Sequence, residues 1–409
     1  MKWKNCFVGD FVEAGHADIQ TGPFGTQLKA SDYVSDGTPV INVRNIGFGN
    51  LRLDKLEYVA EETTDRLAVH LLRESDIVFG RKGAVDRHLF VAKEQENWMQ
   101  GSDCIRLRFE TEEVCPRFVS YAFLRNEHQK WMLTQSGNKA TMASLNQDII
   151  KRIPLHLPSR HEQEAIVAVL SAYDSLIENN LRRMKLLEDS ARLLYREWFV
   201  RLRFPGHEHT RITNDVPEGW EREMLSELTD YLSRGITPHY DDEAEGIVIN
   251  QKCIRNGRLD LSHTRHQSKE FAPVRQVQVG DVLVNSTGEG TLGRVAQVKA
   301  PISFCTVDTH VTIVRPKPGL GMHYFGMAVM DWEPKFTTMG RGATNQTELS
   351  RTAIGETKIL IPTHTLAQEF ESYVGPIYSQ ITNLIEQNHK LKTARDLLLP
   401  KLMSGEIAV

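Results

Sequence analysis

Two stretches of the chain repeat large apolar residues every seven positions, in two interleaved sets. They run from about residue 158 to 204 and from about 363 to 409. A heptad repeat sustained over about four heptads predicts long helices that pair along an apolar seam. The expected seam residues are Ile166, Leu170, Tyr173, Ile177, Asn180, Met184, Leu187, Phe370, Ile377, Ile381, Leu384, Asn388 and Leu391.

The residues in front of each heptad stretch predict where its helix begins. Ser159 is followed three positions later by Glu162, which is the spacing of a capping box. Behind Pro362, Thr365 and Gln368 have the same spacing. A helix of about 40 residues, at 1.5 Å rise per residue, would be roughly 60 Å long.

Each seam has one asparagine near its middle, Asn180 in the first and Asn388 in the second. A buried Asn costs stability but fixes the register when it pairs with another polar group. In a pair of antiparallel helices, the residue numbers of facing positions always add to the same value. Asn180 and Asn388 add to the same value as the midpoints of the two helices, residues 182 and 386. We therefore expect an antiparallel coiled coil in which the two asparagines face each other. The alternative is that each occupies a solvated seam position.

Outside these helices the pattern changes to short β segments divided by turns, in residues 1–157 and 217–362. We expect an α+β fold with two tandem β-rich domains of mainly antiparallel sheet, each followed by a long helix (158–204 and 363–409). Residues 205–216 between them contain Pro and Gly and predict a linker. The expected strands are Pro39–Val43, Asp76–Phe79, His88–Val91, Cys104–Phe109, Gly246–Gln251, Asp281–Val284, Gly293–Val298 and Val311–Val314, with a helix around Pro116–Thr134.

The two β-rich domains are copies of one module. Residues of the first copy recur 205 positions later, over more than a hundred residues. Each copy is far longer than the 20–50-residue units of solenoids, which indicates tandem duplication of a whole domain. Two similar but non-identical modules suggest a molecule that reads two different targets at a fixed separation. The recurring residues are Asp76, Gly83, Asp103 and Gln163 in the first copy, and Asp281, Gly288, Asp308 and Gln368 in the second.

Composition is that of a soluble globular chain, with 40% hydrophobic and 25% charged residues among 409. No apolar window is long enough for a membrane span and the N-terminus lacks the apolar core of a signal peptide, so we expect a cytoplasmic protein. A net charge of −4 excludes a uniformly basic nucleic-acid binder but leaves local basic patches open. The five cysteines form no C-x-x-C pair, which favours a reducing compartment and argues against zinc or disulfides.

Motifs for catalysis are sparse. Gly288–Gly293 fits G-x-G-x-x-G after an apolar strand, which leaves a self-contained nucleotide-dependent enzyme as one hypothesis. Such a loop needs a helix N-terminus behind it, whereas Arg294–Val298 alternates like a strand and favours a hairpin turn. His207–His209 lies in the linker without further ligands, so no metal site is expected there. We expect no catalysis by this chain.

Two loops recur in both copies and carry side chains of the kinds that contact phosphates and base edges. One follows the central strand of each copy, and the other lies shortly before the long helix. Equivalent loops that differ in sequence on matching scaffolds indicate two readers with different targets; ordinary solvated turns are the alternative. The candidate DNA-binding residues are Arg81, Lys82, Arg87, Asn138, Lys139, Asn285, Ser286, Thr287, Arg294, Arg341, Asn345 and Gln346.

In this order and at this spacing, the features resemble the specificity (S, HsdS) subunits of type I restriction-modification systems. The resemblance covers essentially the whole chain. It rests on the two variable domains, the two similar long helices, and five short strings at their borders. These strings are Pro158–Gln163, Trp198–Gly206, Pro217–Trp220, Pro362–Gln368 and Leu402–Ile407.

The resemblance implies two target-recognition domains, each reading one half of a bipartite, asymmetric site in double-stranded DNA. The helices would set the gap between the halves and dock two methyltransferase (M) subunits that use S-adenosylmethionine. Restriction/translocase (R) subunits would use ATP and magnesium, and this chain would hold no cofactor of its own. A structural coiled-coil adaptor with two protein-binding heads is the alternative.

Overall fold

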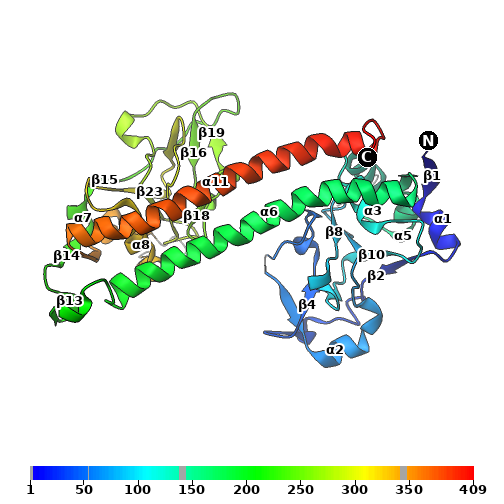
Figure 1. The fold of residues 1–409 in the computed structure, drawn as a ribbon, viewed down its shortest axis with the longest axis horizontal. Coiled ribbons are helices and arrows are strands. Elements are labelled where there is room, and N and C mark those ends of the chain that lie inside the picture. The colour runs from blue at the N-terminus through cyan, green and yellow to red at the C-terminus, as the bar shows by residue number, and fades with distance from the viewer. Residues whose placement is uncertain (1–2, 54, 138–143, 341–347) are drawn as a thin grey trace. The chain divides into compact units, whose positions relative to one another are not determined.

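A computed structural model describes residues 3–53, 55–137, 144–340 and 348–409, which form two compact units. Unit 1 comprises residues 1–178 with 388–409, and unit 2 comprises 179–387. The long helices α6 (Arg160–Tyr195) and α11 (His364–Met403) each contribute residues to both units. Each unit therefore combines one β-rich module with part of each long helix (Figure 1). Within the described ranges, no helix has the length and apolar character needed to cross a membrane.

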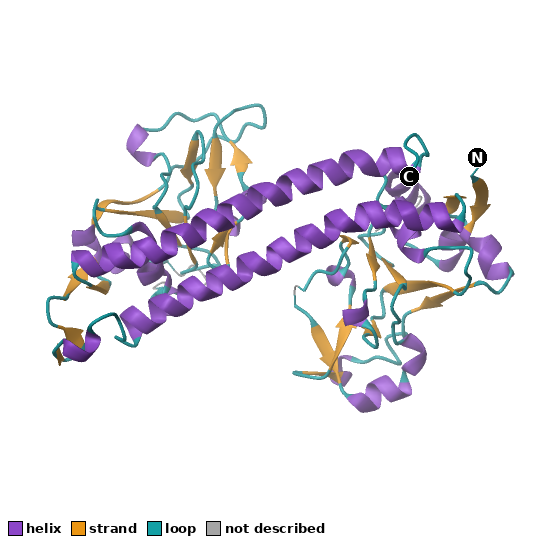
Figure 2. Ribbon diagram, viewed as in Figure 1, coloured by secondary structure: helices purple, strands orange, loops and turns teal. Residues whose placement is uncertain are grey.

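Unit 1 is built on a five-stranded sheet in the order β2-β10-β7-β8-β5 and a four-stranded sheet in the order β3-β6-β4-β9, with β1 paired to β11. Figure 2 shows short helices beside these sheets. The strands are β1 Lys4–Phe7, β2 Ala17–Thr21, β3 Tyr33–Val34, β4 Thr38–Ile41, β5 Phe48–Gly49, β6 Glu57–Val59, β7 Ile77–Gly80, β8 His88–Phe90, β9 Met99–Gln100, β10 Cys104–Phe109 and β11 Pro154–Leu157. The helices are α1 Val8–Glu13, α2 Glu61–Arg66, α3 Pro116–Phe123, α4 Asn126–Ser136 and α5 Gln147–Lys151.

Unit 2 repeats this plan with a four-stranded sheet, β15-β23-β20-β21, a three-stranded sheet, β19-β16-β22, and the pair β14–β24. The strands are β12 Ile212–Thr213, β13 Val216–Pro217, β14 Glu221–Met224, β15 Thr229–Arg234, β16 Ile247–Ile249, β17 Ile254–Arg255, β18 Arg258–Leu259, β19 Arg265–His266, β20 Val282–Asn285, β21 Val295–Gln297, β22 Cys305–Val307, β23 Val311–Pro316 and β24 Lys358–Ile361. The helices are α7 Leu225–Leu228, α8 Met322–Met330, α9 Glu333–Phe336 and α10 Arg351–Gly355.

The order β15-β23-β20-β21 matches β2-β10-β7-β8, so the duplication seen in the sequence is confirmed in the topology. Most strand pairs are antiparallel, as predicted, while β4–β9, β5–β8 and β16–β22 run parallel. The helix expected over Pro116–Thr134 is instead two helices, α3 and α4, which are divided at Leu124 and Arg125.

A buried ion pair occupies the same place in both units. The Asp76 carboxylate accepts hydrogen bonds from Arg108 Nε and Nη2, both at 2.7 Å, and Asp281 accepts from Arg315 at 2.7 and 2.8 Å. Both aspartate side chains are fully buried. Burial of an unpaired charge is costly, so each carboxylate depends on its arginine. The duplicated spacing revealed the aspartates, but not their partners.

The first helix begins as predicted, because Ser159 Oγ accepts a hydrogen bond from Glu162 N at 3.3 Å. The second prediction was wrong by two residues. Thr363, not Thr365, precedes the first turn of α11, and its Oγ1 accepts from Leu366 N at 3.5 Å. The cap lies directly after Pro362, whose ring cannot continue a preceding helix but leaves the next residue free to cap one.

The predicted equivalence of Gln163 and Gln368 was also wrong. The buried Gln163 accepts from Cys115 N at 2.8 Å, just before α3, whereas Gln368 is exposed. In unit 2 the matching role belongs to Glu371, whose Oε1 accepts from Tyr324 N at 2.9 Å in the first turn of α8. The segment that leads into the long helix differs in length between the two copies. Matching residues of α6 and α11 are therefore 208 positions apart rather than 205.

In unit 1 the parts of α6 and α11 run antiparallel and complete the core of the β-rich module. Ile166 and Leu170 are buried in one cluster with Leu399 and Leu402. Asp174 bridges three elements: its carboxylate accepts from Arg395 of α11 at 2.6 Å and, on α3, from the Tyr121 hydroxyl at 2.6 Å and Arg117 at 3.1 Å. The helices are therefore part of the domain core, and not a separate rod.

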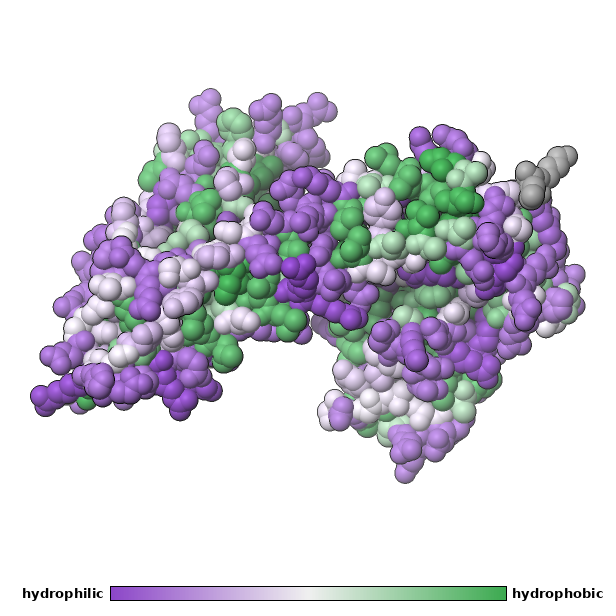
Figure 3. Space-filling view, in the orientation of Figure 1, coloured by the Kyte–Doolittle hydropathy of each residue, from purple (hydrophilic) through white to green (hydrophobic). Residues whose placement is uncertain are grey.

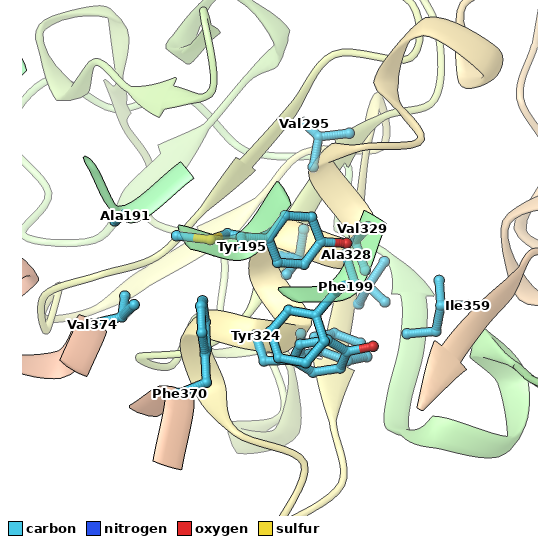
Figure 4. Packing of buried hydrophobic residues seen from close by; sticks show 14 of the residues in the cluster. Ala191, Tyr195, Phe199, Val295, Tyr324, Ala328, Val329, Ile359, Phe370 and Val374 are labelled. Carbon is cyan, nitrogen blue, oxygen red and sulfur yellow. The ribbon is translucent and has the colours of Figure 1, made fainter. Parts of the chain in front are cut away.

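In unit 2 the corresponding contact is aromatic. Figure 4 shows Tyr195, Phe199, Tyr324 and Phe370 converging from α6, the π-helical turn that follows it, α8 and α11. The ring centroids of Phe199 lie 4.6 Å from Tyr324 and 5.0 Å from Phe370. Edge-to-face pairs at this distance contribute about 0.5–1.5 kcal/mol beyond the area that they bury.

The predicted seam residues are buried or half-buried throughout both helices. Asn180 is buried, and Asn388 Nδ2 lies 3.4 Å from the carbonyl oxygen of Ile177 in unit 1. The pairing of Asn180 with Asn388 stays a prediction.

Substitution of Asp76 by Ala should lower the free energy of unfolding of unit 1 by about 3–5 kcal/mol, because it leaves the Arg108 guanidinium buried without its partner. The control is Glu110→Ala, which removes an exposed partner 3.9 Å from Arg73 and should cost under about 1 kcal/mol. Urea unfolding of both variants measures the difference. Equal losses would contradict the structural role of the buried pair.

Unit 1 should lose stability in mild acid because of two histidines, the buried His88 and the half-buried His128. Desolvation lowers the pKa of both side chains to about 3, with smaller contributions from His128 and Arg117 at His88, and from Arg125 at His128. The folded state therefore keeps both rings neutral, whereas the unfolded chain protonates them near pH 6.5. This stability is complete above pH 6.5 and is lost as the pH falls from 6.5 towards 3, by about 1.4 kcal/mol per pH unit for each ring.

His128→Phe, which keeps the stacking on Phe123 at a ring distance of 4.3 Å, should remove one of these contributions. Urea unfolding at pH 7, 6 and 5 should then show a shallower acid dependence than wild type. An unchanged slope would show that His128 titrates alike in the folded and unfolded states.

Candidate nucleic-acid interface

Four segments of unit 1 converge beyond the ends of β2, β7 and β10. Arg81 N donates to Asp103 O at 2.7 Å, and Leu145 N donates to Arg81 O at 2.8 Å. Gln147 Nε2 reaches Thr21 Oγ1 at 3.0 Å, which joins the start of α5 to the end of β2. We call the exposed and half-exposed residues of this junction edge 1: Thr21, Arg81, Lys82, Asp103 and Ser144.

Unit 2 forms the same junction. Ser286 N donates to His310 O at 2.8 Å, and Leu349 N donates to Ser286 O at 2.8 Å. Arg234, at the end of β15, donates to Leu349 O at 3.1 Å and forms an ion pair with Glu348 at 2.7 Å. We call the matching residues edge 2: Arg234, Thr287, His310 and Glu348.

Register relates each edge to the buried ion pair of its unit. In unit 1, β7 and β10 pair so that facing residue numbers sum to 184, as in Ile77 with Leu107. This sum also holds for two further pairs of facing residues, Asp76 with Arg108 at one end of the two strands and Arg81 with Asp103 at the other. A one-residue slip would separate both pairs at once.

The same comparison corrects one sequence-based equivalence. In unit 2, facing residues of β20 and β23 sum to 596, and both Asp281–Arg315 and Ser286–His310 obey that rule. His310 is therefore the counterpart of Asp103. Asp308, which the constant spacing had assigned, instead donates its N–H to Ile249 O, as Gly101 does to Ile41 O. Two extra residues between β20 and β23 account for the shift.

Matched positions of the two edges carry different chemistry. Lys82 Nζ lies 3.3 Å from Asp103 Oδ1, and both side chains are about half exposed. At the same place in unit 2, Thr287 Oγ1 lies 2.6 Å from His310 Nδ1. Isolated bridges also pair Lys82 with Ser144 and Thr287 with Glu348, so the scaffold is shared while the side chains are not.

A glycine after the first strand of each sheet allows the close approach that brings the loops together. A Cβ on Gly22 would lie 2.0 Å from Gly101 O, and one on Gly235 would lie 1.8 Å from Val307 O. No other residue fits at these distances. This segment was missed in the sequence, although Thr-Gly and Arg-Gly directly after a β stretch could have indicated it.

The structure brings three of the sequence-predicted DNA-binding residues, Arg81, Lys82 and Thr287, to the edges. Arg87 lies over the Phe48 ring at 5.1 Å, and Arg294 donates to Gly290 O at 2.7 Å within the hairpin turn. Five candidates lie outside the described residues: Asn138, Lys139, Arg341, Asn345 and Gln346.

Two further candidates are corrected. Asn285 and Ser286 are fully buried. Asn285 Nδ2 donates to Gln251 O and Thr291 O, both at 3.0 Å, and the Ser286 hydroxyl pairs with Thr312 at 2.6 Å. These residues hold the hairpin together from inside. The amide and hydroxyl had suggested base contacts because residue type alone does not reveal burial.

Gly288–Gly293 forms the turn of a hairpin, since β20 and β21 on either side pair antiparallel, as predicted. A Cβ on Gly293 would lie 2.4 Å from Thr337 N, so this glycine is required by packing. The residues His207–His209 form one turn of 3₁₀ helix. Among the described residues, no three His, Cys, Asp or Glu side chains gather as metal ligands would.

Comparison with known proteins finds type I restriction specificity subunits. The family model described as type I restriction modification DNA specificity domain matches residues 2–188. The MjaIX specificity subunit of Methanocaldococcus jannaschii is 26% identical over 72% of this chain and 70% of its own length. The HindI specificity subunit of Haemophilus influenzae is 21% identical over 82% and 87%. Residues 2–188 thus match a type I restriction specificity domain, and the relatives that align with most of this chain are type I restriction specificity subunits.

A solved structure shares the fold. The crystal structure of the S subunit from M. genitalium matches 98% of this chain and 96% of its own chain, at 14% identity and a TM-score of 0.56. That likeness supports the arrangement of two β-rich modules with two long helices.

This chain also has a cavity at the same place in each unit, where a β turn and the short helices after the main sheet meet a long helix. The volumes are about 460 Å³ in unit 1 and 390 Å³ in unit 2. Matching lining residues are Phe48, Glu127 and Pro400 in unit 1, and Asn256, Glu333 and Arg192 in unit 2. A cavity therefore recurs at this place in both units, although most of the matched lining residues differ.

Proposed function

We propose that this chain is the DNA-reading subunit of a type I restriction-modification complex, and that edges 1 and 2 each contact one half of a bipartite, asymmetric site. The observation that carries the proposal is the repeated edge with altered side chains. The two copies share the buried ion pair and the hairpin but differ at every matched position of their edges. Such a pair of modules is suited to binding two different targets. A coiled-coil adaptor would give no reason for that contrast.

The side chains of each edge suit contacts to bases and phosphates. Lys82 and Arg81 can donate to guanine O6 and N7 or to phosphate oxygens, and the Asp103 carboxylate can accept from the cytosine amino group. Edge 2 offers a hydroxyl, an imidazole and the Glu348 carboxylate instead. Because donors and acceptors differ at matched positions, the two half-sites should differ in sequence.

The helices supply the spacing in this proposal. Each recognition module shares its core with one part of α6 and one part of α11. The number of helical residues between the modules would then fix the gap between half-sites, as rigid elements do in other DNA-binding proteins.

Partner subunits complete the proposed complex. Two methyltransferase subunits would bring S-adenosylmethionine, and restriction/translocase subunits would bring ATP and magnesium. This chain would act in the cytoplasm without catalysis of its own. Apolar residues on the outer faces of the helices support docking: Leu186 is 66% and Leu193 57% exposed, and Figure 3 shows apolar side chains over the last turns of α11, where Leu397 is 65% exposed.

The first test is a methylation map of host DNA with and without this chain, co-expressed with its methyltransferase. A bipartite motif with a fixed gap that disappears on deletion is expected. A complex that assembles but methylates DNA without dependence on this chain would refute the proposal.

Arg81→Ala with Lys82→Ala should weaken DNA binding by about tenfold or more and relax only one half of the motif, because contacts of this kind contribute about 1–3 kcal/mol each. If Lys82 contacts phosphate, the slope of log binding constant against log salt concentration should fall in magnitude by about one. Arg294→Ala is the matched control, since its guanidinium is engaged within the hairpin turn. Relaxation of both half-sites, or of neither, would contradict the assignment of edge 1.

Leu186→Asp with Leu193→Asp should reduce the number of methyltransferase subunits bound, because it places two charges on an apolar docking face. Leu261→Asp, at an exposed leucine distant in sequence from both helices, is the control. Mass measurement of the intact complex gives the stoichiometry. Full assembly of the double variant would exclude this helix face as the docking surface.

A further inference from the structure

Phe24 is an exposed aromatic side chain without an evident role in the fold. It is 61% exposed and sits between β2 and Tyr33, in the sequence Gly22-Pro23-Phe24-Gly25. Burial of a phenylalanine stabilises a protein by roughly 1.5–3 kcal/mol, so exposure of most of a ring forgoes that gain. Single exposed hydrophobic residues are common, and the case for a role rests on the position of this one.

The turn that carries Phe24 is held by hydrogen bonds at both sides. Phe24 N donates to Gln27 Oε1 at 3.1 Å, and Phe24 O accepts from Gln27 N at 2.7 Å and Leu28 N at 3.0 Å. Leu28 is buried, and Arg66 of α2 donates to Gln27 O at 2.7 Å. The backbone thus presents the ring from an organised turn, which lowers the entropy that a contact would cost.

This turn is attached directly to edge 1. Gly22 N donates to Cys104 O at 2.9 Å, and Gly22 packs against Gly101 O so closely that a Cβ would not fit. Asp103, between those residues, pairs with Lys82. Phe24 follows Gly22 by two residues, so its backbone lies within about 7 Å of that contact. Phe24 therefore lies on the segment that continues directly from edge 1, which also carries the half-exposed Arg81 and the exposed Lys82.

We propose that Phe24 is a base-contacting residue of unit 1, whose ring packs against the apolar surface of a base in the half-site read by edge 1. The inference rests on the proposed function. Phenylalanine has no hydrogen-bonding group, so it can recognise only a thymine methyl or the face of a base exposed at a deformed step. The neighbouring cations hold the phosphates that bring a base within reach.

Unit 2 lacks the equivalent ring, which makes the contact specific to one half-site. Two residues after Gly235 the chain has Thr237, whose carbonyl accepts from Lys269 Nζ at 3.0 Å. The nearby Tyr240 is 43% exposed, but its ring carries a hydroxyl and stacks with the Arg265 guanidinium, 3.5 Å from the ring centroid. Phe24 would therefore add a purely apolar contact that the matching position of unit 2 does not offer.

The test uses the complex with its methyltransferase subunits and duplexes that carry the mapped site. Phe24→Ala should weaken binding by about fivefold or more and relax one half-site, and Phe24→Leu should retain part of the affinity. The control is Phe7→Ala, since Phe7 is 51% exposed on β1 of the same unit. Uracil-for-thymine and 2-aminopurine duplexes separate the two modes: a methyl contact is sensitive to the first, and an unstacked base gives fluorescence with the second.

Unchanged binding and methylation by Phe24→Ala would overturn the inference while the wild-type motif still supports the proposed function. Loss of binding by Phe7→Ala to the same degree would also overturn it, because the effect would then not be local. Absence of chain-dependent methylation by the wild-type complex would refute the proposed function itself. Thermal unfolding should be unchanged in Phe24→Ala; if it is not, Phe24→Ser supplies a second variant with a polar side chain at the exposed position.

Discussion

The register between two central strands is the constraint on which each recognition unit depends. A fully buried carboxylate requires its arginine, and in antiparallel strands this fixes which residues face each other along the whole ladder. In unit 1 the pair Asp76–Arg108 at one end of the ladder places Arg81 opposite Asp103 at the other. The proposed DNA-contacting edge is thus positioned from the interior, several residues away from any base.

The two copies of the module share several buried features and differ at their exposed edges. The ion pair, the close-packed glycine and the hairpin recur because a change at any of them leaves a buried charge or a steric clash. Lys82 and Thr287 lie on the same scaffold but point outward, where substitution costs little stability. The two edges could diverge for this reason, while the strand order of the two units did not.

The long helices are more than connecting rods, because each recognition core is closed by both of them. In unit 1 an apolar contact between the helices is joined by Asp174, which is bound to Arg395, Arg117 and Tyr121. In unit 2 it is aromatic, around Phe199 and Phe370. A module that shares its core with part of a helix is fixed to that part of the helix.

The sequence by itself determined the periodic features: the duplication, the central strands, the two helices and most of their apolar seam. Heptads and alternating strands are local patterns whose side chains reveal the buried face directly. Burial of Asn285, the pairing of Asp103 with Lys82, and the match of Asp103 to His310 were decided only by the tertiary structure. A constant spacing of 205 positions hides a two-residue insertion, and an amide looks the same in a sequence whether it faces solvent or a carbonyl. Contacts between loops distant in the chain depend on register, which no local pattern encodes.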